Sequence, residues 1–102
     1  MGPALAMVSD RIMRMLLSFY REESALWPQL EPLHHCRFCR SWGVLRISCL
    51  DREHREEVNA LLDLLRPPVL SLRLARQIML LAPGLEPLTY PARVPITEDL
   101  LN

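Results

Sequence analysis

The stretch from Trp42 to Leu81 constrains the fold more than any other part of this sequence. Within it, residues 44–50 alternate, with Leu45, Ile47 and Cys49 all on one side of the chain. Alternation with a period of two predicts a half-buried strand. Asp51 follows and suits a helix N-cap, because its carboxylate can accept a hydrogen bond from a free backbone N–H of the first turn. The pattern therefore predicts a strand that leads directly into a helix.

Apolar residues then recur with helical spacing up to the Pro67-Pro68 pair. The stripe comprises Val58, Leu61, Leu62 and Leu65, and His54 extends it backwards by one turn. Proline displaces the preceding residue from the α region, so the pair predicts the end of this helix.

Residues 69–81 fit two patterns. Their composition of Leu, Ala, Arg, Gln and Met favours a helix over 69–81. The alternation of leucines over 69–75 is the strand alternative, which would make the unit a βαβ crossover.

The remaining elements are predicted from periodicity and proline. We expect an N-terminal helix from Ser9 or Asp10 to about Leu26, and a hairpin of strands 34–39 and 44–50. Three prolines make 85–96 an extended C-terminal arm, either an edge strand or a segment that grips a partner. The 102 residues form one α+β domain, with 1–8 and 97–102 as loose ends and Thr97 as the cap of a final turn.

Composition predicts association. Half of the residues are hydrophobic and the formal net charge is zero. A chain of this length buries only about two-thirds of the surface that its unfolded form exposes, so apolar area is left over without net repulsion to keep molecules apart. We expect a homo-oligomer or a standing protein partner; the alternative is a well-packed monomer.

The cysteines and His54 form the sharpest chemical pattern. Cys36-x2-Cys39, then Cys49 at a strand end and His54 in the next helical turn, could supply four ligands to one zinc ion. His34 and His35 offer alternative ligands. The competing interpretation is that the cysteines are small buried apolar residues. A redox role for Cys36-x2-Cys39 is disfavoured, because a strand and not a helix follows it.

All twelve basic residues are arginine. The arginines on the outer face of the first helix and in the 69–81 segment are candidates for partner binding: Arg11, Arg14, Arg21, Arg73 and Arg76. A second group near Phe38 and Trp42 could bind nucleic acid: Arg37, Arg40 and Arg46. The neighbouring glutamates and the neutral net charge weigh against that alternative.

No catalytic motif is present, and three glycines leave little room for a phosphate-binding loop. The apolar runs are shorter than the roughly 18 residues that a membrane span requires. An odd number of cysteines argues against a secreted disulfide framework. We therefore expect a cytoplasmic, non-enzymatic interaction, adaptor or regulatory domain, which acts through the apolar faces of the first helix and of 69–81. A zinc-stabilised or arginine-rich nucleic-acid-binding module is the alternative.

Overall fold

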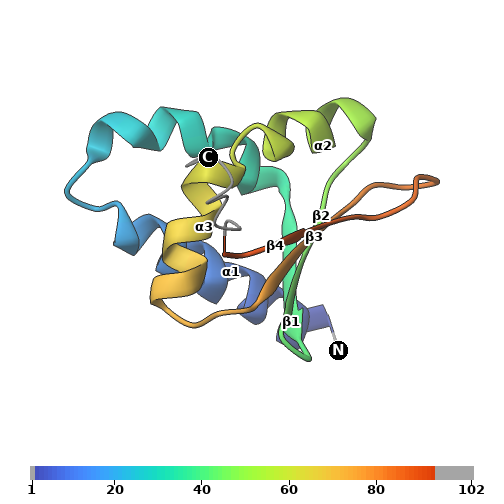
Figure 1. Ribbon diagram of the computed structural model, residues 1–102, viewed down its shortest axis with the longest axis horizontal. Coiled ribbons are helices and arrows are strands. Elements are labelled where there is room, and N and C mark those ends of the chain that lie inside the picture. Colours follow the sequence, from blue (N-terminus) through green and yellow to red (C-terminus); the bar gives the residue numbers. More distant parts are fainter. Residues whose placement is uncertain (1, 94–102) are drawn as a thin grey trace, which may run out of the picture.

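The computed structural model describes the backbone of residues 2–93 and the side chains of residues 11–93. Four helices and four strands follow one another along this part of the chain (Figure 1): α1 (Gly2–Phe19), the 3₁₀ helix η1 (Ser24–His35), β1 (Arg37–Ser41), β2 (Val44–Ser48), α2 (Arg52–Asn59), α3 (Leu62–Ser71), β3 (Gln77–Leu81) and β4 (Leu88–Pro91). The predicted α+β class is confirmed.

The strands form one mixed sheet in the order β1-β2-β3-β4. β1 and β2 make an antiparallel hairpin, β2 and β3 run parallel, and β3 and β4 run antiparallel. A parallel pair needs a crossover connection, and here α2 and α3 provide it. The βαβ alternative is therefore correct in topology, although its second strand lies at 77–81 and not at 69–75.

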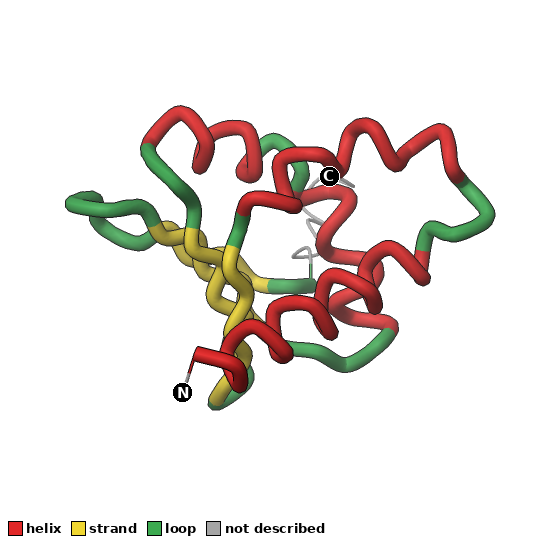
Figure 2. Tube along the Cα trace, turned by 180° about the vertical axis from the view of Figure 1, so that it is seen from behind, coloured by secondary structure: helices red, strands yellow, loops and turns green. Residues whose placement is uncertain are grey.

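The sheet is covered by helices on one face. On the helix-covered face of the three longer strands, Arg40 near the hairpin turn is exposed, whereas five apolar side chains are buried: Phe38, Leu45, Ile47, Ile78 and Leu80. They pack in one core with Ile12 and Leu16 of α1 and with Leu65 and Val69 of α3. Figure 2 shows the helices gathered on the same side of the strands. Period-2 alternation thus gives this sheet one apolar face and one open face.

The first helix differs from its prediction at both ends. It begins at Gly2, within the segment 1–8 that was expected to be loose, and it ends at Phe19 instead of about Leu26. Tyr20 is the last buried residue of the apolar stripe, and residues 21–25 are exposed. With no apolar face left to bury, the chain turns and continues as η1, which contains Pro28 and Pro32.

The Pro67-Pro68 pair does not end a helix. The helix capped by Asp51 ends earlier, at Asn59, and both prolines lie inside α3. A proline removes the N–H that would bond to the carbonyl four residues before it. For Pro68 that carbonyl belongs to Leu64, and the hydroxyl of Tyr20 donates to it instead, at 2.8 Å. A tertiary contact therefore satisfies the acceptor that the proline leaves free.

The favoured helix over 69–81 is wrong beyond Ser71. The chain turns at Leu72 and Arg73, where Arg73 has a φ of 55°, and re-enters the sheet as β3. β3 is buried between β2 and β4, and burial beside two strands outweighs the helix propensity of its residues. The C-terminal arm supplies β4 as an edge strand, on β3 instead of on the hairpin. Residues 97–102 and the Thr97 cap lie outside the described residues.

Candidate functional site: a buried cysteine and histidine cluster and an open sheet face

Cys36 and Cys49 lie opposite each other just beyond the ends of β1 and β2. The hairpin register pairs Arg37 with Ser48, and one step outward brings Cys36 opposite Cys49. Both residues share the helix-covered face with Phe38 and Ile47, because side chains two apart in a strand point the same way. Cys49 is buried and Cys36 is half-buried.

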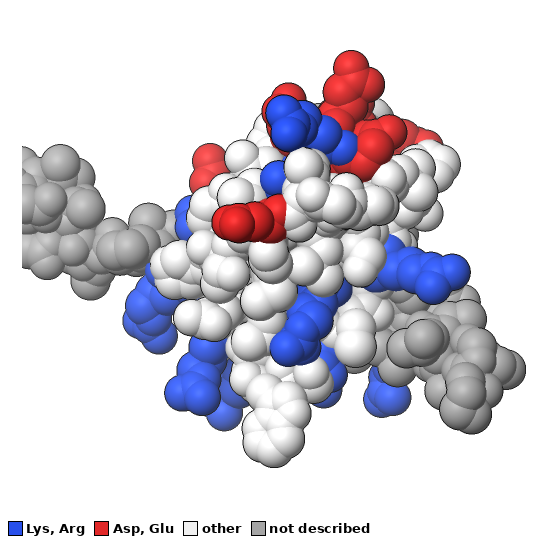
Figure 3. Space-filling view, turned by 90° about the vertical axis from the view of Figure 1, so that its right-hand side faces the viewer, with Lys and Arg blue, Asp and Glu red and all other residues white. Residues whose placement is uncertain are grey.

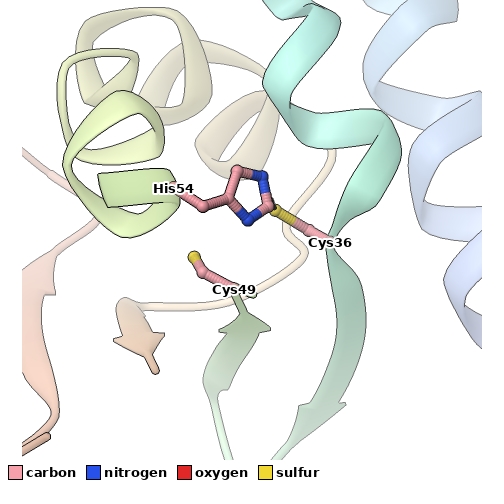
Figure 4. A group of neighbouring side chains, drawn as sticks. All are labelled: Cys36, Cys49 and His54. Atoms are coloured by element: carbon pink, nitrogen blue, oxygen red, sulfur yellow. Dashed lines mark hydrogen bonds between the residues drawn. The ribbon is translucent and has the colours of Figure 1, made fainter. Parts of the chain in front are cut away.

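His54 joins these two cysteines from the first turn of α2 (Figure 4). The Asp51 cap fixes its position, since the carboxylate accepts from the His54 backbone N–H at 2.8 Å. On the ring, Nδ1 accepts from the Leu50 backbone N–H at 2.8 Å, and Nε2 lies 2.8 Å from the Pro32 carbonyl oxygen. A neutral imidazole that accepts at Nδ1 carries its proton at Nε2. His54 therefore connects η1 to the β2–α2 junction as a neutral donor and acceptor.

The three side chains are close enough to bind a metal ion. One sulfur from each cysteine and one nitrogen of His54 all lie within 4.8 Å of one another. The distance from Cys36 Sγ to His54 Nε2 is 3.8 Å. A tetrahedral zinc with Zn–S of about 2.3 Å and Zn–N of about 2.0–2.1 Å separates such ligand atoms by roughly 3.6 Å. A metal at Nε2 would replace the ring proton and the hydrogen bond to Pro32.

The two thiols are electrostatically unequal. A hydrogen bond with Cys49, reinforced by burial, raises the pKa of Cys36 well above its ordinary value of 9.0. The same hydrogen bond lowers the pKa of Cys49, although burial opposes it, and the positive charge of Arg55 adds to the lowering. Of the two sulfurs, that of Cys49 is therefore the one that becomes a thiolate more readily.

The structure does not bring Cys39 into this cluster. Cys39 is exposed on β1 and points to the opposite face of the sheet, because it is three residues from Cys36. His34 and His35 are also exposed, although the His35 ring lies 6.2 Å from that of His54 in an edge-to-face arrangement. Three of the four predicted ligands therefore meet. The two members of the Cys-x2-Cys pair are separated, because strand geometry places Cys36 and Cys39 on opposite faces of the sheet.

The five arginines predicted to bind a partner are all exposed, but they do not share one surface hollow. Arg11 and Arg14 line a shallow groove with Met15, Phe19 and Leu72. Arg21 lines a different hollow beside Glu22 and Glu23. Arg73 lies in the turn that follows α3, and Arg76 directly precedes β3.

The apolar faces that were expected to bind the partner are largely used inside the chain. On α1, Ile12 and Leu16 are 4% and 1% exposed, and in the 69–81 segment Ile78 and Leu80 are fully buried. These faces form the core instead of a docking surface. Part of the apolar surface that composition predicted to remain exposed is thus buried in the core.

The open face of the sheet was not predicted as one surface, although Arg37, Arg46 and the nearby Trp42 were candidates from the sequence. Its side chains are those that alternate away from the helices: Arg37, Cys39, Ser41, Val44, Arg46, Ser48, Gln77, Met79, Leu81 and Thr89. This face has two arginines, Arg37 and Arg46, and the four strands contain no acidic residue; the third strand arginine, Arg40, lies opposite Leu45 on the helix-covered face. Figure 3 shows acidic side chains toward one end of the molecule, with arginine among them, and separate arginines on an otherwise uncharged surface toward the other end. Although the net charge is zero, acidic and basic side chains are therefore unevenly distributed over this side of the molecule.

Trp42 stands at the edge of this face, in the turn between β1 and β2. Its side chain is 93% exposed, the most of any large hydrophobic residue in the described part of the chain. Trp42 and Gly43 have φ values of 53° and 75°, which define a two-residue turn of type I′. Non-glycine residues in this region are mostly Asn, Asp or His, so a bulky tryptophan is an outlier.

No protein-family model, no curated protein and no solved structure matches this chain. Among the described residues, no helix has the length and apolar character needed to cross a bilayer.

Proposed function

We propose that this chain is a non-enzymatic protein-binding module that docks an acidic, partly apolar segment of a protein partner. The docking surface is the open face of the sheet together with Trp42. One observation carries the proposal: a 93% exposed tryptophan occupies a left-handed position at the edge of that face.

The cost of this tryptophan supports a role in binding. A left-handed conformation costs a residue with a Cβ about 1–2 kcal/mol, whereas Asn and Gly adopt it readily. The exposed indole makes little contact that could offset the cost within the fold. Unfavourable backbone conformations that persist are concentrated at functional sites, and Trp and Arg are the residues that most often dominate binding energy at interfaces.

The charge and shape of the open face indicate the partner. Arg37 of β1 and Arg46 of β2 lie beside the apolar Met79 and Leu81 of β3, and the strands have no carboxylate to neutralise them. The guanidinium of Arg46 donates to the Ser41 hydroxyl at 2.7 Å, which holds its side chain along the sheet. Such a face complements a segment with carboxylates around an apolar centre.

A protein partner fits this face better than a nucleic acid does. Proteins that bind single strands on a sheet stack bases on aromatic rings of its exposed face. Here both aromatic residues of the strands, Phe38 and Tyr90, lie on the helix-covered face and pack in or against the core. Arginines, aliphatic side chains and uncharged polar side chains occupy the open face, without an aromatic ring from the strands.

The absence of an enzymatic role and a cytoplasmic location are part of the proposal. Both nitrogens of His54 are engaged with backbone groups, so this histidine is not poised to activate a neighbouring thiol. The three free cysteines suit a reducing compartment.

The test is quantitative affinity capture with surface variants. Wild-type protein, Trp42→Asn and the double variant Arg37→Glu/Arg46→Glu are immobilised in equal amounts, and bound proteins are quantified. Leu50→Asn is the matched control, because Leu50 is 62% exposed and lies outside the sheet. The proposal predicts that the same partner is retained by wild type and Leu50→Asn and lost by both open-face variants.

Two defined probes separate the classes of partner. An extended peptide of alternating Glu and Leu and a single-stranded oligonucleotide are titrated at low and high salt. Binding of the peptide, lost in Arg37→Glu/Arg46→Glu, supports the proposal. Salt-dependent binding of the oligonucleotide alone would replace it with the nucleic-acid alternative. Light scattering that shows a dimer in wild type and a monomer in Trp42→Asn would identify the partner as a second copy.

Zinc binding is a second candidate function, and the clustering of Cys36, Cys49 and His54 within 4.8 Å favours it. A bound zinc would join η1, the end of β2 and the start of α2, and so stabilise the fold. If it binds, the purified protein contains about one zinc per chain, and a chelator lowers Tm. His54→Gln should remove the metal, whereas Cys39→Ser should retain it. Metal analysis that finds no zinc in freshly purified protein would exclude this candidate.

A further inference from the structure

Cys36 and Cys49 form a cross-strand pair of the kind in which side chains approach closest. In an antiparallel pair, opposed residues either exchange two backbone hydrogen bonds or exchange none, and the second kind brings the side chains nearer. The Cys36 backbone N–H donates to the Leu33 carbonyl, and that of Cys49 donates to the Leu81 carbonyl of β3. Because both N–H groups bond elsewhere, this pair is of the closer kind.

The sulfur atoms are already near each other. They lie within 4.8 Å of each other, and both cysteines are free. A disulfide requires Cβ atoms about 3.5–4.5 Å apart, and directly opposed Cβ atoms of an antiparallel pair lie about 4.5–5.5 Å apart, less where no backbone bonds are exchanged. Small side-chain movements are sufficient to join them.

The pair also lies at a structural junction. Cys36 ends η1 and precedes β1, whereas Cys49 follows β2 and precedes α2. A covalent link here would close the hairpin at its open end and tie η1 to the start of α2. It would therefore restrict the same region that the hydrogen bonds of His54 hold together.

We propose that Cys36 and Cys49 are a reversible redox pair that forms an intramolecular disulfide when the protein meets a hydroperoxide. One thiolate attacks the peroxide, the O–O bond breaks, and the departing hydroxide takes up a proton as water. The resulting sulfenic acid is attacked by the second sulfur, the S–O bond breaks, and the second oxygen leaves as water. Two thiols lose two electrons to the peroxide, and a small-molecule thiol reverses the reaction by exchange.

Cys39 provides a control within the same molecule. It is more exposed than either member of the pair and points to the other face of the sheet. A peroxide that modified cysteines by exposure alone would act first on Cys39. The geometry instead predicts that Cys36 and Cys49 are joined while Cys39 is left without an intramolecular partner.

Peptide mapping tests this proposal on the wild-type chain. Cleavage after arginine places each cysteine in a separate peptide: 22–37 contains Cys36, 38–40 contains Cys39 and 47–52 contains Cys49. Reduced, chelator-treated protein is exposed to hydrogen peroxide, alkylated and digested without reductant. We expect peptides 22–37 and 47–52 joined by a bond that dithiothreitol breaks, and intact monomer that has lost two hydrogen atoms.

Variants and stability complete the test. Cys39→Ser should retain the bond, and Cys36→Ser should lose it. In Cys39→Ser the oxidised form should melt at least about 5 °C above the reduced form, because the link restricts the unfolded chain. Peptide 38–40 joined to another peptide as the main product, or Cys36 and Cys49 both still alkylated after Cys39 has been oxidised, would overturn the proposal.

Discussion

The hydroxyl of Tyr20 donates a hydrogen bond to the carbonyl oxygen of Leu64, at 2.8 Å, across 44 residues of sequence. Leu64 lies four residues before Pro68, whose missing N–H would otherwise bond to that carbonyl. The contact joins the end of the first helix to the first turn of α3. It explains how α3 continues through two prolines that sequence reasoning takes as a helix end.

Substituting Tyr20 should measure this contact directly. Tyr20→Phe leaves the Leu64 carbonyl without its donor, and an unsatisfied buried acceptor costs about 1–3 kcal/mol. We expect the free energy of unfolding in urea to fall by that amount. Tyr90→Phe is the control, because the Tyr90 hydroxyl has no hydrogen-bond partner among the described residues. Equal effects of the two variants would refute the role assigned to Tyr20.

The same residue predicts a pH dependence at the alkaline end. Burial, and secondarily the negative charge of Glu23, raise the pKa of Tyr20 above its ordinary value of 10.0. The unfolded state then loses the phenolic proton at lower pH than the folded state does. The stabilisation from Tyr20 is fully present below pH 10 and is lost as pH rises through the folded-state pKa. Urea unfolding across this range should show a decline that is smaller in Tyr20→Phe.

His54 should be more important for stability than the exposed histidines. It accepts from Leu50, donates to Pro32 and is only 7% exposed. His54→Ala leaves two backbone groups unsatisfied and a small void, so we expect a loss of about 2–4 kcal/mol. His34→Ala, at an exposed position, should change stability by less than about 0.5 kcal/mol. Chemical denaturation compares the two, and similar losses would contradict the structural role of His54.

The Asp51 cap makes a smaller, separate contribution. Its carboxylate accepts from the His54 backbone N–H at 2.8 Å, as the sequence predicted for an N-cap. Asp51→Ala should cost about 1 kcal/mol, or roughly 4–8 °C in Tm for a domain of this size. Glu56→Ala, exposed later in the same helix, serves as the control. A thermal melt in which Asp51→Ala matches wild type would show that the cap does not stabilise α2.

Local signals in the sequence were sufficient for the parts of the fold that depend on neighbours along the chain. The alternation around Ile47 and the cap at Asp51 predicted β2 and the start of α2, because each follows from a few adjacent residues. The continuation of α3 through Pro68 and the conversion of 77–81 into β3 depend on distant contacts, from Tyr20 and from β4. The spacing of residues along the sequence does not predict such long-range contacts.

The candidate site divides in the same way. Cys36, Cys49 and His54 were predicted to meet and do meet, since a hairpin and a capped helix bring them together. Cys39 was predicted as a fourth zinc ligand because of its spacing from Cys36. An odd spacing along a strand, however, places two side chains on opposite faces of the sheet. The turn was predicted at 40–43, whereas the structure has the two-residue turn Trp42-Gly43. Such turns favour Asn-Gly, so Trp-Gly is the sequence signal that could have pointed to Trp42.

Capture of the partner by Trp42→Asn, measured beside its thermal melt, tests the central claim most directly. Asn suits the left-handed position, so the variant should be about 1 kcal/mol more stable than wild type, whereas removal of the indole should reduce retained partner at least about tenfold. A more stable protein that no longer binds is the predicted result. Undiminished capture by Trp42→Asn would contradict the proposal that this open face and its tryptophan are the binding surface.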